Sequence, residues 1–182
     1  MFEAEKASRT PRSDFYNCLF AAVRQFYNQK EDGYYLLAGY PWFKFRARDE
    51  FIDLTGATLA IGEVGMFEKI MERGTQAVHD FIDGKPKSTK LKEVSTPDVL
   101  LWYIWAVQQY AQFTSLQQTA ERYGNVLVKI IAFIRGQKHV NLFLHDNGLL
   151  FTDGTKKPAT WMNAMENGYP ITPRTGYVVE IN

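Results

Sequence analysis

The chain has 182 residues, a length that suits one domain or a piece of a larger one. Hydrophobic residues make up 46% and charged residues 23%, which excludes a disordered chain and allows a sizeable core. The formal net charge of +1 gives no reason to expect a nucleic-acid partner, and the single cysteine excludes an internal disulfide.

The longest apolar run, Val99 to Val107, is too short to span a bilayer, and no signal peptide is visible. We therefore expect no membrane partner and a cytoplasmic location. Cys18 lies among apolar residues and is expected to be buried. The one basic run is typical of a solvated loop and comprises Lys85, Lys87, Lys90 and Lys92.

In chain order, residues 1–12 are polar and expected to be disordered. Ser13 or Asp14 can cap a first helix, which Gly33 ends. Its apolar residues recur at helical spacing: Phe15, Leu19, Ala22, Val23 and Phe26. The next stretch, YYLLAGYPWF, is too short and irregular for another helix and is expected to be extended.

A second helix is expected from Arg48 or Asp49 to Gly62, and a third over residues 64–82, with Gly74 as a point where it can break. A fourth follows Thr96 as its N-cap, with Pro97 at the first helical position.

Nine consecutive apolar residues, 99–107, leave the fourth helix no polar face, so it is expected to be buried on every side. Ser115 is expected to cap a fifth helix.

After Gly136 the pattern changes. Asn147-Gly148 stands between apolar runs, which predicts a β-hairpin. The remainder is rich in Gly, Pro, Thr and Asn and indicates a long ordered loop with short strands. Amphipathic and fully apolar helices that alternate in this way favour an all-α toroid with an inner and an outer ring. A plain helical bundle accounts for the helices but not for these loops.

No catalytic or metal-binding spacing is present, so we expect no cofactor and no metal site. The isolated histidines, His79, His139 and His145, are expected to be surface or packed residues.

Aromatic, Arg and Asp side chains in loops are typical of sugar binding, because rings stack on pyranose faces and charged groups bind hydroxyl pairs. The stretch AGYPWFKFRARDEF is the strongest candidate subsite. Its walls would be Tyr40, Trp42 and Phe43, and its hydroxyl clamp Arg48 and Asp49. An aromatic plug, with Asp49 placed only to favour a helix start, explains the same residues equally well.

Five ordered motifs carry a family resemblance: AGYPWF with RDEFIDLTGATLA, then TPDVLLWYIWAVQQY, GLLF, TWMNA and TPRTGYVVEIN. They resemble the C-terminal catalytic domain of glycogen debranching enzymes, the amylo-α-1,6-glucosidase part, over roughly residues 34–182. The resemblance implies an (α/α)6 toroid related to glucoamylases. It also implies hydrolysis of the single α-1,6-linked glucose left at a trimmed glycogen branch point, with inversion at the anomeric carbon.

The resemblance also implies site residues. Arg48 and Asp49 match the Arg-Asp pair that holds the terminal glucose, and Tyr40 and Trp42 lie in the same motif. The other matches to cleft motifs are Asp98, Trp102, Trp161, Arg174 and Glu180.

Three departures from the family pattern bear on function. In TWMNA, Asn163 stands where the family has the acidic residue that resembles its general acid. Asn has no proton to give up at any useful pKa, whereas an inverting glycosidase needs one carboxylic acid and one carboxylate. The chain is a natural inactive relative, carries an engineered substitution, or uses another acid, for which Glu166 is the nearest candidate.

The second departure replaces the family's Trp-Gly before the Arg-Asp pair by Arg46-Ala47, with Phe45 one position earlier. The third is length. The closing VVEIN normally opens the sixth helix, so residues 1–182 are expected to be a single partial domain, the first half of the toroid. The expected partners are an α-glucan, the remaining half of the domain in a parent chain, and a second copy through self-association.

The sequence therefore predicts a fragment of a debranching-type α-1,6-glucosidase that is inactive in isolation. A catalytically silent α-glucan-binding module is the alternative, and a helical interaction domain without a sugar role is the third. Position 163 separates the first two, because an acid there is needed for cutting and not for holding.

Overall fold

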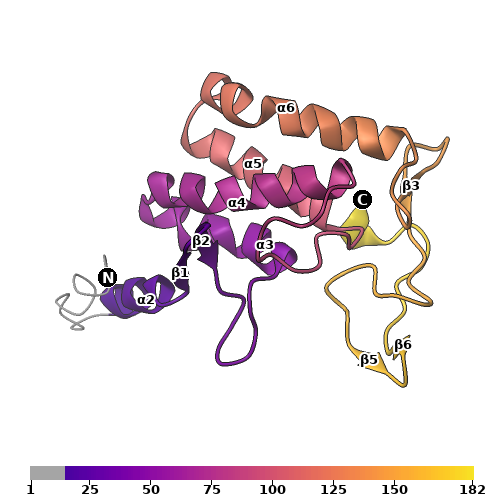
Figure 1. Ribbon diagram of the computed structural model, residues 1–182, viewed down its shortest axis with the longest axis horizontal. Coiled ribbons are helices and arrows are strands. Elements are labelled where there is room, and N and C mark those ends of the chain that lie inside the picture. The colour runs from indigo at the N-terminus through magenta and orange to yellow at the C-terminus, as the bar shows by residue number, and fades with distance from the viewer. Residues whose placement is uncertain (1–14) are drawn as a thin grey trace.

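The structure is a computed structural model that describes residues 15–182. The expected disorder of residues 1–12 and the Ser13 or Asp14 cap lie outside the described residues. The described part is mostly helical with small antiparallel hairpins (Figure 1). Its helices are α2 Phe15–Arg24, α3 Ala47–Ala57, α4 Val64–Ile82, α5 Val99–Phe113 and α6 Leu116–Arg135, with single turns η1 Leu59–Ile61 and η2 Val179–Ile181. The hairpins pair β1 Tyr27–Lys30 with β2 Gly33–Leu36, β3 Phe143–Leu144 with β4 Leu150–Phe151, and β5 Met165–Glu166 with β6 Tyr169–Pro170.

The first predicted helix is wrong beyond Arg24, where α2 ends and the β1–β2 hairpin begins. Gly33 is a turn residue and not a helix stop, with φ 140, and it pairs with Lys30 across the turn. β2 buries Tyr35 and Leu36 and packs against α4, and this tertiary burial outweighs the local helical spacing. The prediction of an extended YYLLAGYPWF is confirmed at its start by β2.

Cys18 is exposed, so its predicted burial is wrong. Ala21 is the one buried residue of α2, while Phe15 and Tyr16 are more than three-quarters exposed. The apolar sequence around Cys18 belongs to a helix that projects from the body of the described chain, where it has little to pack against (Figure 1).

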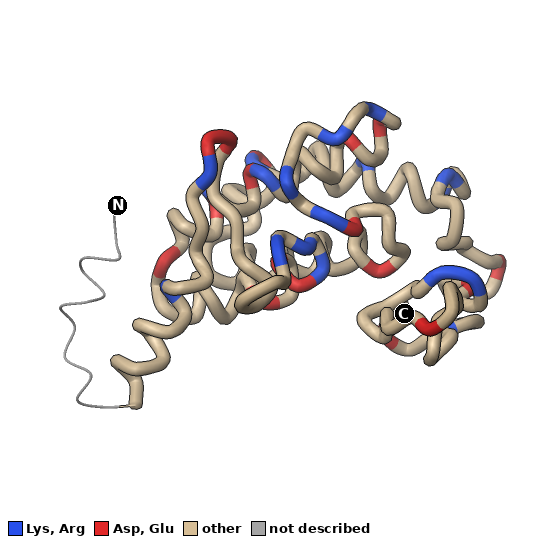
Figure 2. Tube along the Cα trace, turned by 60° about the horizontal axis from the view of Figure 1, so that its bottom comes forward, with Lys and Arg blue, Asp and Glu red and all other residues tan. Residues whose placement is uncertain are grey.

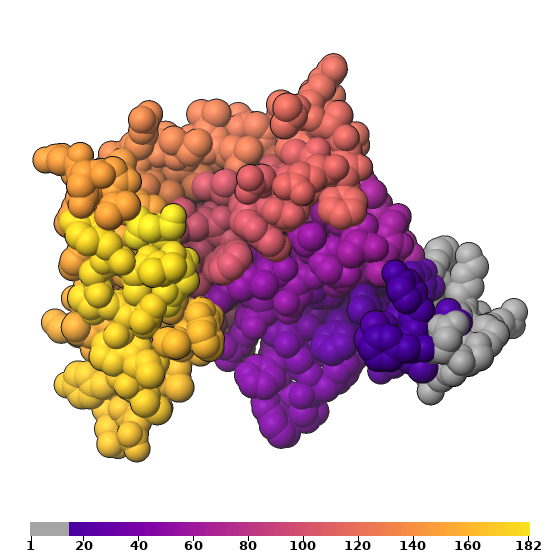
Figure 3. Space-filling model, turned by 180° about the vertical axis from the view of Figure 1, so that it is seen from behind, coloured from indigo at the N-terminus to yellow at the C-terminus, as the bar shows by residue number. Residues whose placement is uncertain are grey.

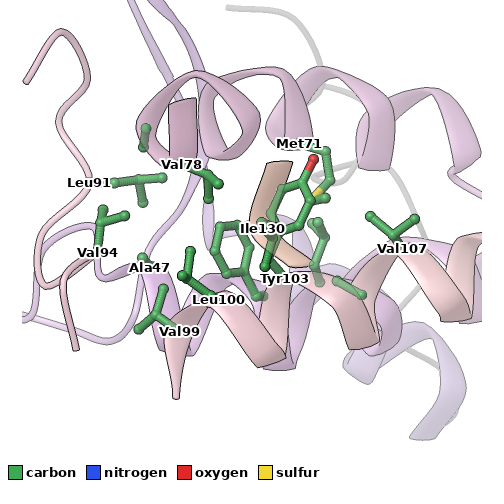
Figure 4. Packing of buried hydrophobic residues seen from close by; sticks show 14 of the residues in the cluster. Ala47, Met71, Val78, Leu91, Val94, Val99, Leu100, Tyr103, Val107 and Ile130 are labelled. Atoms are coloured by element: carbon green, nitrogen blue, oxygen red, sulfur yellow. The ribbon is translucent and has the colours of Figure 1, made fainter. Parts of the chain in front are cut away.

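The core lies where α3 packs on α5 and where α6 packs on α4 and α5. Figure 4 shows Met71, Val78, Leu100, Tyr103 and Ile130 converging from α4, α5 and α6. The ring of Phe51 on α3 meets that of Tyr103 edge-on, with centroids 5.3 Å apart.

α4 runs through Gly74 without a break. A Cβ built at Gly74 would lie 2.6 Å from Cε1 of Phe51, so the absence of a side chain allows α3 and α4 to approach closely. The Gly is a packing residue here and not a helix breaker.

The start and the burial of α5 differ from the prediction. Asp98, not Thr96, occupies the N-cap position, and the Thr96 hydroxyl donates to the backbone oxygen of Glu93 at 2.9 Å. The helix is not buried on every side, because several large residues along one face remain partly exposed: Leu101, Trp102, Ile104 and Trp105. Ser115 caps α6 as predicted, accepting from the Gln118 N–H at 3.1 Å.

The segment that follows α6, residues 136–182, forms a lobe beside the helices, which we call the C-terminal lobe. Figure 3 shows it across an open notch from the loop between β2 and α3. The hairpin predicted at Asn147-Gly148 is confirmed as β3–β4. The predicted helical class is likewise confirmed, while closure into an (α/α)6 toroid stays a prediction. None of the helices in residues 15–182 is long and apolar enough to cross a membrane.

Candidate substrate cleft

A buried ion pair connects the start of α3 to the start of α5. Arg48 Nε lies 2.6 Å from Asp98 Oδ2, and Arg48 Nη2 lies 3.0 Å from Asp98 Oδ1. The two residues are 3% and 1% exposed. Arg48 is therefore turned inward, and the geometry joins two predicted site residues that lie 50 positions apart in the chain.

Burial raises the pKa of Asp98, and the bonds from Arg48, with a further hydrogen bond from the Trp102 side chain, oppose that rise. The Trp102 side chain therefore lies next to the Asp98 carboxylate. It meets the Trp105 ring edge-on, with centroids 5.6 Å apart and planes at 83°. Trp102 and Trp105 together form an aromatic corner on the partly exposed face of α5, next to the ion pair.

This aromatic corner lines a cavity of about 440 Å³ between α5 and the C-terminal lobe. The β3–β4 hairpin forms a second wall and η2 a third. The lining residues are Leu101, Trp102, Trp105, Gly148, Leu149, Leu150, Glu180, Ile181 and Asn182. Asn182 closes one edge, because its side chain bonds both the N–H and the carbonyl of Leu150, at 2.8 and 3.0 Å.

Glu180 supplies the one carboxylate of this lining. Arg174 Nε lies 2.7 Å from Glu180 Oε1, and Arg174 Nη2 lies 2.5 Å from Oε2. Arg174 lowers the pKa of Glu180, so this carboxylate is ionised at neutral pH and can accept hydrogen bonds. Five predicted site residues are thus connected to one cavity. Trp102 and Glu180 line it, Asp98 bonds Trp102 and Arg48, and Arg174 bonds Glu180.

A close backbone approach positions Arg174. A Cβ built at Gly154 would lie 2.4 Å from the Arg174 carbonyl oxygen and 2.5 Å from its nitrogen. The Gly154 N–H also donates to Thr175 Oγ1 at 3.0 Å, next to the bridge between Thr152 and Gly176. The absence of a side chain at Gly154 therefore allows the segments 152–154 and 174–176 to lie in direct contact.

Tyr40 and Trp42 lie elsewhere, on the loop that projects between β2 and α3. The Ala38 N–H closes this loop by donating to the Lys44 carbonyl at 3.1 Å. The Tyr40 hydroxyl donates to the Gln25 carbonyl, and the Trp42 side chain is 75% exposed. The loop is an exposed aromatic surface and does not line the cavity described above.

The family's acid position makes no hydrogen bond to either ion pair in the described residues, although Thr160, three residues before it, hydrogen-bonds Glu180. Asn163 is half-buried in the lobe, where its N–H donates to the Trp161 carbonyl at 2.9 Å. Trp161 and Glu166 are exposed, and Figure 1 shows the β5–β6 hairpin that carries Glu166 at the tip of the lobe. Within residues 15–182, no hydrogen bond or ion pair joins Asn163, Trp161 or Glu166 to Arg48 or Asp98.

Asp49 is half-buried on α3, one turn before Asp53. Burial, with a contribution from the charge of Asp49, raises the pKa of Asp53. Asp49 does not join the Arg48–Asp98 pair. Its role in holding sugar, like the roles of the other site residues, stays a prediction.

The histidines lie as predicted: His139 is buried, and His145 is exposed with Nδ1 at 2.7 Å from the Tyr177 hydroxyl. No three or more His, Cys, Asp or Glu side chains in the described chain are arranged to hold a metal ion.

Two features were missed by the sequence reasoning. Trp105 lines the cavity, and its spacing of three from Trp102 on one helix was a usable signal. Glu50 is 1% exposed, and burial raises its pKa well above the usual range although the Leu36 N–H donates to Oε2 at 2.8 Å. Nothing in the sequence distinguishes Glu50 from the solvated acids around it.

Comparison with protein families matches residues 20–182 to the family described as Amylo-alpha-1,6-glucosidase. Comparison with curated proteins and with solved structures finds no match. The match covers all five motifs and nearly the whole described chain, including the ion pairs and the cavity. The chain therefore belongs to the amylo-alpha-1,6-glucosidase family, the C-terminal glycoside hydrolase domain of glycogen debranching enzymes.

Proposed function

We propose that the chain binds the α-1,6-linked glucose of a trimmed α-glucan branch in the cavity between α5 and the C-terminal lobe. The observation that carries this is the aromatic corner of Trp102 and Trp105 facing the ionised Glu180 across about 440 Å³. An indole face suits the apolar face of a pyranose, and a carboxylate suits a pair of hydroxyls. The volume is in the range of ordinary small-ligand sites.

Preorganisation supports this assignment. The Arg48–Asp98 pair orients Trp102, and Arg174 holds both oxygens of Glu180. Side chains that are already fixed lose little entropy when a ligand binds. Arg48 contributes by fixing the wall of the cavity, because its fork is taken up by Asp98.

The family reaction is hydrolysis with inversion, which needs one protonated carboxyl group and one carboxylate. Glu180 is ionised and cannot serve as the acid, and Asp98 is closed off from solvent. Asn163 at the family's acid position cannot donate a proton at any useful pKa. We infer that residues 1–182 bind the branch and do not cut it, and a catalytically silent glucan-binding module remains the alternative to a catalytic fragment.

The test measures binding and cutting separately. Calorimetric titration with an α-1,6-branched malto-oligosaccharide should give saturable binding that the linear oligosaccharide of equal length does not match. Trp105→Ala should weaken binding about tenfold, while Phe113→Ala, at the far end of α5, should leave it unchanged. No binding of either oligosaccharide would contradict the proposal.

Cutting is followed as glucose release from a glycogen limit dextrin. We expect none from the chain as it stands. If Asn163→Asp releases glucose and the matched Asn167→Asp does not, the catalytic-fragment form holds and position 163 is the acid. The same variants are assayed in a chain that also carries the remaining half of the domain; if binding persists and neither variant cuts there either, the chain is a binding module.

A further inference from the structure

Two extended segments of the chain run side by side just before α3. The Lys92 N–H donates to the Phe45 carbonyl at 2.9 Å, and the Ala47 N–H donates to the Lys92 carbonyl at 3.0 Å. Arg46 and Lys92 form a parallel bridge between them. The segments 44–46 and 90–92 therefore form a short two-stranded ribbon.

The buried residues of this ribbon decide where its cations lie. Phe45 is 9% exposed and Leu91 fully buried, so the middle residue of each segment points into the core. Alternation along an extended chain then places the flanking residues on the opposite, outer face. The outer residues are all basic and form what we call the basic strip: Lys44, Arg46, Lys90 and Lys92.

In Figure 2, blue Lys and Arg positions gather near the middle of the described chain, with red acidic positions interleaved. Bridged residues lie about 5 Å apart across strands, so Arg46 and Lys92 are like charges placed side by side, which is unfavourable unless an anion lies between them. The pKa of Lys87 is lowered, mainly by burial and additionally by the positive charge of Lys92. Lys87 therefore also experiences repulsion from the basic strip.

The carboxylates nearby compensate this charge weakly. Arg46 Nη1 lies 3.4 Å from Glu93, and Lys90 Nζ lies 3.9 Å from Asp32. Within the described residues, neither Lys44 nor Lys92 has a carboxylate within ion-pairing distance. By contrast, Arg48, two positions after Arg46, is fully paired with Asp98.

The basic strip continues into the aromatic loop. The Arg46 guanidinium lies over the Phe43 ring, 5.4 Å from its centroid, and this stacking leaves its planar edge available to an oxyanion. Trp42 and Tyr40, on the same loop, are 75% and 58% exposed. A stacking surface for sugar rings thus adjoins a set of cations that carboxylates compensate only weakly.

We propose that the basic strip binds a phosphate monoester borne by an α-glucan whose sugar rings stack on the loop of Tyr40, Trp42 and Phe43. This rests on the proposed glucan binding and adds a charged substituent to the substrate class. A phosphate monoester carries nearly two negative charges and oxygens that match the guanidinium fork. At this position the family pattern has a Trp-Gly pair, and Arg46-Ala47 exchanges the apolar wall for a cation.

The test titrates the chain with branched glucan fragments that bear phosphate monoesters, and with the same fragments after phosphatase treatment. We expect the phosphorylated fragments to bind about tenfold more tightly at low salt, with the difference shrinking as ionic strength rises. The double variant Arg46→Gln/Lys92→Gln should lose the difference and keep its affinity for the dephosphorylated fragments. Equal affinity for both fragments in the unmodified chain would overturn the proposal.

The matched control is Arg135→Gln/Lys138→Gln, which removes one Arg and one Lys from exposed positions at the end of α6. It should retain the preference, and thermal melting should show both double variants folded. If the Arg46→Gln/Lys92→Gln variant still prefers phosphorylated fragments, or if the control variant loses this preference, the preference comes from net charge and not from the basic strip. Lys44→Gln, on the same face, gives a second variant and should reduce the preference in part.

Three further outcomes separate the possibilities. If the phosphorylated fragments bind through Arg46 and Lys92 while the dephosphorylated ones do not bind at all, the strip holds and the cavity proposal fails. If inorganic phosphate alone competes as strongly as the phosphorylated glucan, the strip takes free phosphate and the glucan part is overturned. If single-stranded RNA binds more tightly through the same two residues, the partner is a nucleic acid and the proposal fails.

Discussion

Arg48 and Asp98 form a bidentate ion pair that is almost completely withdrawn from solvent, with Nε–Oδ2 and Nη2–Oδ1 distances of 2.6 and 3.0 Å. The pair joins the first turn of α3 to the N-cap of α5, and Asp98 also bonds the Trp102 side chain. It therefore couples the packing of two core helices to the orientation of an indole in the candidate cleft.

Removing one partner of this pair should be costly. Arg48→Gln leaves the Asp98 carboxylate buried without its counter-charge, and we expect a loss of about 3–5 kcal/mol in the free energy of unfolding. Urea denaturation at neutral pH measures it. Arg46→Gln, which removes a partly exposed pair at 3.4 Å, is the control and should cost less than about 1 kcal/mol. Equal losses in the two variants would refute a special role for the buried pair.

Glu50 should make the stability of the chain depend on pH. Burial raises its pKa in the folded state, so between the ordinary Glu pKa and the raised one the folded chain binds more protons than the unfolded chain. Its contribution to stability is complete below the ordinary pKa and is lost as pH rises toward the folded-state value. Glu50→Gln, whose amide oxygen can still accept from Leu36, removes this loss.

We therefore expect Glu50→Gln to gain stability relative to the unmodified chain as pH rises from 4 to 8, by about 1–3 kcal/mol. Denaturation curves at a series of pH values measure the difference. Glu121→Gln, on the exposed side of α6, is the control and should show no such trend. Parallel pH profiles for Glu50→Gln and the unmodified chain would mean that the Glu50 carboxyl ionises normally.

Two helix glycines should respond oppositely to alanine. At Gly74 the new Cβ would meet the Phe51 ring at 2.6 Å, so Gly74→Ala should destabilise the chain by about 1–3 kcal/mol. At Gly124 in α6 nothing lies within 4 Å, so Gly124→Ala should stabilise it by about 0.5–1 kcal/mol. Thermal melting compares the two. A destabilised Gly124→Ala would show that the outer face of α6 is packed in solution.

Gly154→Ala should destabilise the C-terminal lobe locally and leave the packing of the helical core unchanged. Its Cβ would overlap the Arg174 backbone at 2.4 Å, which must move and carry Arg174 away from Glu180. We expect amide hydrogen exchange to rise in residues 152–182 and to stay unchanged in α4, α5 and α6. Binding of branched oligosaccharide should weaken in parallel. Unchanged exchange in the lobe would mean that the two strands can separate without loss of Arg174–Glu180.

The sequence predicted local features better than contacts between distant segments. Ser115 and Asn147-Gly148 were predicted correctly because a helix cap and a tight turn depend on a few adjacent residues. The first helix was wrong past Arg24 because residues 27–30 pair with β2, whose Tyr35 and Leu36 are buried, and this pairing outweighs the local helical spacing. Cys18 was wrong because an apolar sequence does not reveal whether another element covers it.

The candidate site shows the same division. Motif order singled out Arg48, Asp98, Arg174 and Glu180, but it could not pair them. Whether Arg48 is free to bind a ligand depends on Asp98, which lies 50 positions away in the sequence. The sequence predicts that Arg48 holds sugar, and the structure adds that its Nε and Nη2 bond Asp98; the sugar contact stays a prediction. Trp105 gained its place in the cavity only through the tertiary approach of the β3–β4 hairpin and η2.

The most direct test of the central claim is a calorimetric titration of residues 1–182 with an α-1,6-branched malto-oligosaccharide, with free glucose assayed in the same sample. We expect saturable binding without glucose release, and binding about tenfold weaker in Trp105→Ala at unchanged thermal stability. Absence of binding, or binding that Trp105→Ala leaves intact, would contradict the assignment of the α5 cavity as the glucose site.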